Sequence, residues 1–225
     1  MTTQIESNAP EVVIPERLDV QAPIHELLAH RWSPRAFSDR PVESGKLLSL
    51  FEAARWAPSS ANEQPWRFVT ATKDDSRVYS ALSGSLMEAN RRWAEQAPLL
   101  VLALAQSTYT RTGRPYQHSW YDVGQSVALL SVQATALGLA VHQMGGFDAE
   151  KARQLLSIPE GFEPVIVFAV GYPDRPETLP EELRKREQAP RSRKQLQDSI
   201  YTEEWGKPSS HIPTGNTLLT RPSTN

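Results

Sequence analysis

Apolar residues in the first part of the chain recur with a helical spacing that breaks at prolines. Residues 23–30 predict a short helix that starts at a proline and ends before Pro34. Residues 44–56 predict a second helix, with Ser44 as its N-cap and Pro58 beyond its end. The apolar positions that carry this spacing are Ile24, Leu27, Leu28, Leu47, Leu48, Phe51 and Ala54.

Four segments read as strands. Residues 66–72 alternate apolar and polar side chains, which predicts a strand with one covered face. Residues 99–105 are apolar at every position, as in a strand buried on both faces. Residues 139–144 and 164–172 complete the set, and the second of these also reads as a buried strand.

The second half of the chain also carries helical patterns. Short helices are expected over 75–82 and 88–96, and Asp148 is expected to cap another that runs to residue 156. Residues 119–137 form a long helix that is apolar on more than one face, with Gly138 as its natural C-cap. Such a helix must be buried in a core or against a partner chain. Alternating helices and buried strands indicate an α/β or α+β layered fold.

Polar and proline-containing segments bound this pattern. We expect a flexible N-terminal arm over 1–22, one globular domain over 23–206 and a C-terminal extension over 207–225. The last thirty or so residues lack a core of their own and are expected to lie on a neighbouring chain. Residues 108–117 read as an exposed loop that shapes a pocket mouth.

Composition narrows the functional class. The 225 residues include 24 Lys and Arg against 26 Asp and Glu, a formal net charge of −2 that favours neither DNA nor RNA as a partner. The absence of cysteine excludes a disulfide framework, a thiolate metal site and a thiol nucleophile. No signal sequence or long apolar run is evident, so we expect no membrane association and a cytoplasmic location.

Two short segments suggest a phosphorylated, flat cofactor. Arg31, Ser33 and Arg35 place two guanidinium groups and a hydroxyl at a helix end, a set that suits a phosphate, although two solvated charges would look the same. Residues 58–66 form a polar loop before a strand, with donors and acceptors at Ser59, Ser60, Asn62 and Gln64. The loop could equally be a plain helix-to-strand connection.

Three further patterns have both an ordinary and a functional interpretation. Gly145 and Gly146 form a tight turn or let a flat ligand approach backbone amides. The basic run at 190–194, with Arg191 and Arg193, is a solvated surface or an anion contact. Residues 120–122 cap the long helix or line a pocket. The five histidines show no metal spacing, so no metal site is expected.

In sequence order, these motifs resemble the FMN-dependent nitroreductase family over roughly residues 24–206. The resemblance rests on Arg31, Ser33 and Arg35; the Pro-Ser-Ser-x-Asn-x-Gln-Pro-Trp run at 58–66; Asp122, Gly124 and Gln125; Gly138 and Leu139; residues 145–148; and Arg191 with Arg193.

The resemblance implies an α+β fold: a three-layer α-β-α sandwich with a mixed, mostly antiparallel sheet, in an interlocked homodimer with FMN at the subunit interface. It assigns the FMN phosphate and ribityl tail to Arg31, Ser33, Arg35 and Arg193, with Arg191 as a helper. Ser59, Ser60 and Asn62 would reach the flavin of the other subunit, and Gln64 a flavin edge. Gly145 and Gly146 would offer backbone amides near the flavin N5.

The implied activity is hydride transfer from NAD(P)H through FMN to a nitroaromatic, a quinone or a similar acceptor by a ping-pong mechanism. No side chain would be catalytic, since the cofactor carries the chemistry. Two departures from the family pattern are Gly145, at a position where some members place an acidic residue before the glycine, and Gln195, where the family usually has a proline after the late basic pair. A non-catalytic flavin carrier or sensor, and a dehydrogenase or flavin-fragmenting enzyme on the same scaffold, are the alternatives.

Overall fold

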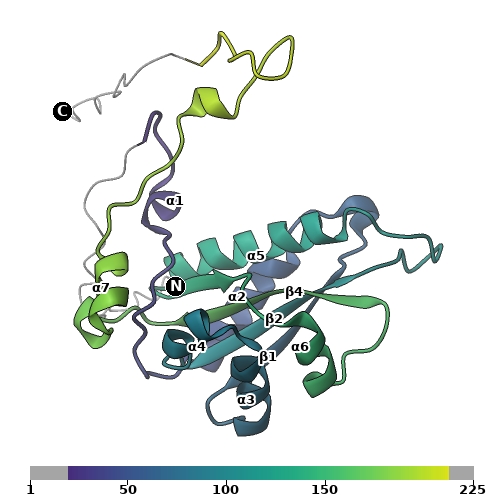
Figure 1. The fold of residues 1–225 in the computed structure, drawn as a ribbon. Helices are drawn as coiled ribbons and strands as arrows, with labels where there is room; N and C mark the ends of the chain where they lie inside the picture. The colour runs from purple at the N-terminus through teal and green to yellow at the C-terminus, as the bar shows by residue number, and fades with distance from the viewer. Residues whose placement is uncertain (1–19, 213–225) are drawn as a thin grey trace, which may run out of the picture.

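The computed structural model describes residues 20–212, which form a sheet with helices on both faces and a projecting C-terminal segment (Figure 1). The helices are α1 (Glu26–His30), α2 (Ser44–Arg55), α3 (Ser76–Ser85), α4 (Glu88–Ala94), α5 (Ser119–Ala136), α6 (Ala149–Leu156) and α7 (Glu181–Glu187). The strands are β1 (Trp66–Thr72), β2 (Leu99–Gln106), β3 (Ala140–Met144) and β4 (Phe162–Gly171).

The sheet has the order β1-β2-β4-β3, and all of its pairs in residues 20–212 are antiparallel. The expected α+β class is confirmed, whereas the expected parallel component is absent from this part of the chain. The reason lies in the topology: β2 and β3 run in the same direction, but β4 lies between them. One row of the register joins Val69, Leu102, Val167 and Met144 across the four strands.

Strand β2 is apolar up to its last residue, Gln106, and is buried on both faces, which creates the predicted three layers. Successive side chains of a strand point to opposite faces. Leu100 and Leu102 therefore join one core with α3, α4 and α6, and Val101 and Ala103 join the other with α2 and α5. The three-layer α-β-α sandwich predicted from the sequence is thus confirmed (Figure 1).

Helix α5 buries one face and leaves part of the other open. Val123, Val127 and Leu130 face the core, while Leu129 keeps 39% of its surface. Gly138 follows the helix with a φ of +72°, so the predicted glycine stop is confirmed. None of the helices in residues 20–212 has both the length and the hydrophobicity needed to cross a bilayer.

Two helix starts differ from the prediction. Ser44 is the first helical residue of α2 and Glu43 takes the cap position, so the Ser44 cap was wrong by one residue. Helix α1 begins at Glu26, three residues later than expected, because His25 Nδ1 accepts the amide of Leu27 at 3.2 Å and caps it. This five-residue helix buries none of its residues.

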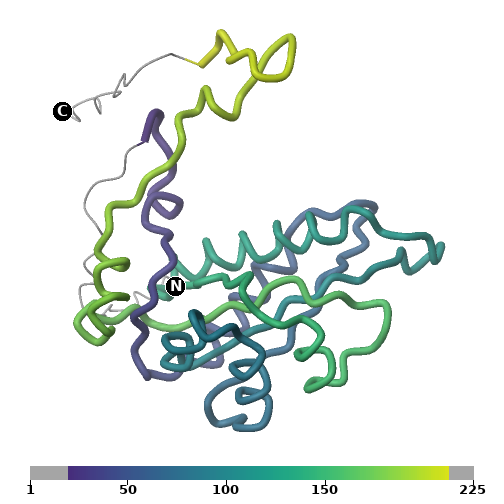
Figure 2. The backbone as a smooth tube through the Cα atoms, in the orientation of Figure 1, coloured from purple at the N-terminus to yellow at the C-terminus, as the bar shows by residue number. Residues whose placement is uncertain are grey.

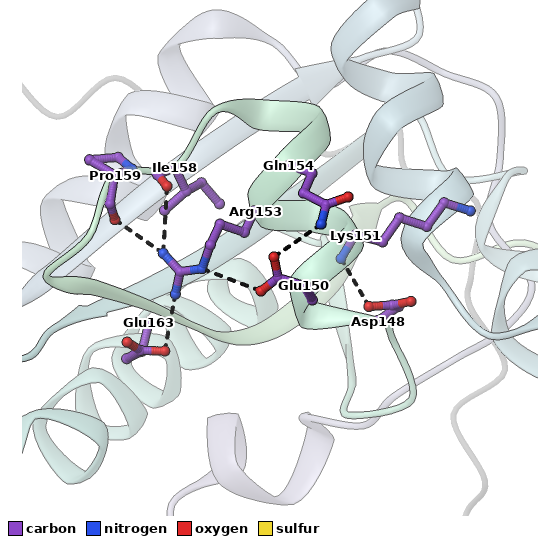
Figure 3. A network of polar contacts seen from close by, with 8 residues as sticks. All are labelled: Asp148, Glu150, Lys151, Arg153, Gln154, Ile158, Pro159 and Glu163. Carbon is purple, nitrogen blue, oxygen red and sulfur yellow. Dashed lines mark hydrogen bonds and ion pairs between the residues drawn. The ribbon is translucent and has the colours of Figure 1, made fainter.

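Helix α6 is held at both ends (Figure 3). Asp148 caps its start as predicted, accepting the Lys151 amide at 2.9 Å. At its other end the Arg153 guanidinium donates to the Pro159 carbonyl and to the Glu163 carboxylate, both at 3.1 Å. The Asp148 cap holds the end of the segment that leads from β3 into α6, which contains the two glycines singled out in the sequence, whereas the Arg153 bonds hold the segment between α6 and β4.

The chain after α7 leaves the body and turns back on itself as a small hairpin in which Tyr201 bridges Pro208 (Figure 2). The Leu196 amide there donates to the Gln21 side chain at 2.6 Å. Most of the expected arms, over 1–22 and 207–225, lies outside the described residues. The domain limits and the neighbour expected beneath the C-terminal arm remain predictions.

Candidate functional site

Three arginines from the two ends of the chain converge beside α1. Arg191 donates to the carbonyl of Ala29 at 2.9 Å and to the carbonyl of Arg31 at 3.0 Å. Arg31 in turn donates to the hydroxyl of Ser33 at 3.3 Å. Arg193 lies near enough for its positive charge to lower the pKa of both Arg31 and Arg191. The structure therefore brings together residues that lie 160 positions apart in sequence.

The charges of this cluster are not compensated within the described chain. Burial, followed by repulsion from Arg193, lowers the pKa of Arg31; burial and then repulsion from Arg31 and Arg193 lower that of Arg191. Across residues 20–212 no carboxylate forms an ion pair with any of the three. Partly buried guanidinium groups that lie close together without a carboxylate partner are able to bind a phosphate or another multivalent anion.

Arg35 differs from the other three arginines because a carboxylate already faces it. Its guanidinium lies 3.6 Å from the carboxylate of Glu187, whose side chain is buried at the end of α7. The same carboxylate accepts the backbone amides of Arg35 and Ala36. Glu187 thus fixes the position of the 31–35 segment as well as the Arg35 charge.

His142 links this segment to strand β3. Its Nδ1 donates to the carbonyl of Pro34 at 2.7 Å, and its ring packs on Trp93 at 4.4 Å between centroids. Burial lowers the pKa of His142 to about 4, opposed in part by the bond to Pro34. The ring is therefore neutral at pH 7, with its proton on Nδ1.

The two glycines follow His142 on the same edge of the sheet. The Gly146 carbonyl accepts hydrogen bonds from the Met87 amide at 3.0 Å and from Asn90 Nδ2 at 3.1 Å. Within the described chain, neither the Gly145 nor the Gly146 amide donates to a protein acceptor. A side chain added at Gly145 would meet open space. Two free amides beside that space can bind a flat polar ligand.

The 59–64 loop is held in an unusual backbone conformation at the start of β1. Ala61, Asn62 and Gln64 each have a φ of +54°, which non-glycine residues adopt at a cost. The Ser59 hydroxyl accepts the Gln64 amide at 3.0 Å, and the Gln64 side chain donates to Asn62. The loop thus has a defined shape.

The arginine cluster and the 59–64 loop do not form one site within a single chain. The glycines follow β3, whereas the loop precedes β1, and these are the two outer strands of the sheet. Three strand spacings separate them by about 14 Å in the plane of the sheet. Figure 2 shows residues 31–35 and 59–64 at opposite ends of the body. The predicted site residues therefore fall into two separate groups.

Known proteins share this arrangement of elements. The model of the nitroreductase family matches residues 28–172, well over half of the chain. The chain belongs to the nitroreductase family. This confirms the resemblance read from the motifs, and the match spans Arg31, Ser33, the 59–64 loop and the two glycines. Arg191 and Arg193 lie beyond it.

Individual proteins similar to this chain support the same family assignment. A crystal structure described as an oxidoreductase containing FMN is 34% identical, covers 83% of this chain and 94% of its own, and superposes with a TM-score of 0.77. An NADH dehydrogenase of Thermus thermophilus is 29% identical over 64% of this chain and 83% of its own length. Iodotyrosine deiodinase 1 of Rattus norvegicus is 26% identical over 72% of this chain and 66% of its own.

Three residues that the sequence did not single out have clear positions in this nitroreductase-family site. Glu187 fixes the 31–35 segment, His142 joins that segment to β3, and Asn90 supports the Gly146 carbonyl. No local sequence signal identifies them, because each acts through a partner more than fifty residues away. Within residues 20–212 no group of three or more potential metal ligands is gathered.

Proposed function

We propose that this chain binds FMN and transfers hydride equivalents from NAD(P)H to a nitroaromatic, a quinone or a similar acceptor. The proposal rests chiefly on the cluster of Arg31, Arg191 and Arg193, which no carboxylate of residues 20–212 pairs. The segment that carries Arg31 is bonded through Pro34 to His142 of β3, the strand that leads into the two glycines. A phosphate monoester carries nearly two negative charges, which this cluster would balance.

The described residues fit FMN along the β3 edge. Arg31, Ser33 and Arg193 would bind the phosphate and ribityl tail, with Arg191 holding the 29–31 backbone in place and Arg35 beside them. Residues 142–145 extend along β3 for about 10 Å, since a strand rises about 3.3 Å per residue. The amides of Gly145 and Gly146 would then meet the ring system. When bound, FMN supplies the hydride acceptor and donor, so no side chain needs to act as acid or base.

A complete site would need two copies of the chain. The 59–64 loop lies at the opposite edge of the sheet, so we propose that it reaches the FMN of a partner subunit. Exposed apolar side chains on α2 and α5 favour the same conclusion, since contiguous apolar surface marks interaction sites. They are Leu48, Trp120, Tyr121 and Leu129, with Trp56 directly after α2. The proposed assembly is a homodimer with two equivalent sites.

The acceptor is the part of the proposal that family membership leaves open, because one scaffold supports several reactions. Relatives named as an NADH dehydrogenase and as an iodotyrosine deiodinase illustrate this range. We propose a ping-pong order in which the nicotinamide leaves before the acceptor enters the same cleft.

The test is an anaerobic titration of the purified protein. We expect a flavin absorption spectrum that NADH or NADPH bleaches and that a quinone or nitroaromatic restores, with parallel double-reciprocal lines in steady state. A flavin spectrum that neither nucleotide bleaches would favour a carrier or sensor instead. A protein that cannot bind added FMN would overturn the proposal.

A further inference from the structure

The connection between β2 and α5, residues 107–118, is folded into a compact turn. Thr108 bridges Pro115, and the Tyr109 amide donates to the Arg114 carbonyl at 2.9 Å. The Tyr116 amide donates back to the Ser107 carbonyl at 2.7 Å. The rings of Tyr109 and Tyr116 stack with their centroids 4.2 Å apart.

This turn packs against the 59–64 loop. The Tyr109 and Ser60 hydroxyls lie 3.2 Å apart, and the Thr110 amide donates to the Glu63 carboxylate at 2.6 Å. The Tyr116 hydroxyl lies 3.3 Å from the Ser60 carbonyl. The two segments are more than forty residues apart in sequence, yet they form one polar cluster.

Asp122 is at the centre of this cluster. Asp122 is only 3% exposed. Its carboxylate accepts hydrogen bonds from the Ser60 amide at 3.0 Å, from the Tyr116 hydroxyl and from the Gln125 side chain at 3.3 Å. It lies in the first turns of α5, where the helix dipole also favours a negative charge. The carboxylate is therefore fully partnered and oriented toward the loop.

The 59–64 loop needs such support because three of its residues are in the left-handed region. A non-glycine backbone of this kind persists only where its surroundings over-determine it. Hydrogen bonds within the loop join Ser59 to Gln64 and Ser60 to Glu63, whose amide donates to the Ser60 carbonyl at 3.1 Å. Ser60 is tied in addition to Asp122 and Tyr109, which lie outside the loop. The loop conformation thus depends on the partners supplied by α5 and by the turn before it.

We propose that Asp122, Tyr116 and Tyr109 are positioning residues that hold the 59–64 loop in the conformation that contacts the FMN of a second copy of the chain. The 107–118 turn then acts as a brace for that loop. This inference rests on the proposed function, since it needs FMN at the subunit interface. It predicts that removing a hydroxyl group from the brace alters FMN binding, although that hydroxyl does not contact the FMN held by its own chain.

Tyr116→Phe in the full-length protein tests the brace by removing one hydroxyl. Tyr79→Phe is the matched control, because the Tyr79 hydroxyl is also buried and bonded, to the Ala97 carbonyl at 2.6 Å, but it lies in the core around α3. The measurements are FMN affinity by flavin fluorescence, visible circular dichroism of the bound flavin, thermal unfolding and dimer mass.

We expect Tyr116→Phe to weaken FMN binding about tenfold and to change the flavin dichroism, with the dimer mass retained. Tyr79→Phe should lower thermal stability alone. Asp122→Asn, which retains an acceptor for only part of the cluster, should weaken FMN binding at least as much as Tyr116→Phe. Equal flavin affinity and dichroism in wild type, Tyr116→Phe and Asp122→Asn would overturn the brace while leaving the proposed function intact. A wild-type protein without affinity for FMN would overturn both.

Discussion

The carboxylate of Glu187 accepts the backbone amide of Arg35 at 2.8 Å, across 152 residues of sequence. A second bond, from the Ala36 amide at 3.1 Å, and the Arg35 guanidinium complete its partners. Glu187 is 5% exposed. Glu187, which lies outside the residues matched by the family model, thus positions the segment 31–35.

Glu187→Ala should lower the free energy of unfolding by about 3 kcal/mol, because it leaves two buried amides and one guanidinium without an acceptor. Urea denaturation measures this. Glu182→Ala is the control from the same helix: its carboxylate forms only a surface pair with Arg92, so the free energy of unfolding should stay close to that of the wild type. Equal losses in the two variants would contradict the role given to Glu187.

Arg31→Ala and Arg193→Ala should each weaken FMN binding by about 1.5–3 kcal/mol, or roughly tenfold to a hundredfold, through the loss of a charge-assisted hydrogen bond to the phosphate. Fluorescence titration of the apoprotein measures the effect. Arg77→Ala, at an exposed position of α3, should bind FMN like wild type. If both cluster variants kept wild-type affinity, the phosphate site would lie elsewhere.

His142 should make the stability of the protein depend on pH. Its pKa is about 4 in the native state, against about 6.5 in the unfolded chain. Because the unfolded chain therefore takes up the proton first, the free energy of unfolding falls as pH drops from 6.5 to 4, by up to about 3 kcal/mol. Above pH 6.5 the histidine contributes no pH dependence.

His142→Asn isolates this contribution. Asn Nδ2 can take the place of the imidazole Nδ1 as donor to the Pro34 carbonyl, but it does not titrate. Urea unfolding at pH 7 and pH 4.5 should show a smaller loss of stability for the variant than for wild type. Identical losses would mean that other groups carry the acid sensitivity.

Local patterns were sufficient to predict most of the fold. The strand at 66–72, the apolar run at 99–105 and the Gly138 stop each depend on neighbours in sequence, and each is confirmed. The single covered face expected for 66–72 is wrong, because Val69 and Ala71 join one core while Trp66 and Phe68 join the other. The start of α1 was predicted three residues too early, because three apolar residues in so short a segment do not determine where a helix begins. Leu28 of α1 and Ile24, which precedes the helix, both stay half exposed in the described chain.

The candidate site was harder to predict from the sequence than the fold was. Arginines, serines and glycines stand out by type, so the polar positions could be named in advance. Glu187, Asn90 and Asp122 act through buried contacts with distant segments, and a carboxylate that is paired looks the same in sequence as one that is solvated. The separation of the predicted site residues into two groups follows from strand order, which no local pattern reveals.

Leu129→Arg should prevent dimer formation and, with it, FMN retention. Leu129 lies mid-way along α5 with 39% of its surface exposed, so the change is tolerated in one chain but places a charge in the proposed interface. Light scattering should give a mass near 25.2 kDa in place of twice that value. Leu155→Arg, at a leucine of α6 that is 43% exposed, is the control and should remain dimeric.

Gly145→Ala and Gly146→Ala should separate flavin binding from folding. In the described chain a methyl group at Gly145 meets open space, so its effect on the free energy of unfolding should stay within about 0.5 kcal/mol. A methyl group at Gly146 would lie 2.8 Å from Asn90 Nδ2 and would disturb the bond from that amide to the Gly146 carbonyl. Gly146→Ala should therefore cost about 1–2 kcal/mol of stability, part of which Asn90→Ala removes in the double variant.

FMN affinity, unlike stability, should be strongly affected by Gly145→Ala. If the ring lies against its amide, the added methyl group occupies the space that the ring needs, and FMN affinity should fall at least tenfold although the fold is unchanged. Comparing thermal unfolding of the apoprotein with FMN titration distinguishes the two effects. A Gly145→Ala protein that is as stable as wild type and binds FMN equally well would place the ring away from this edge of β3, because no protein group in the described chain competes for that space.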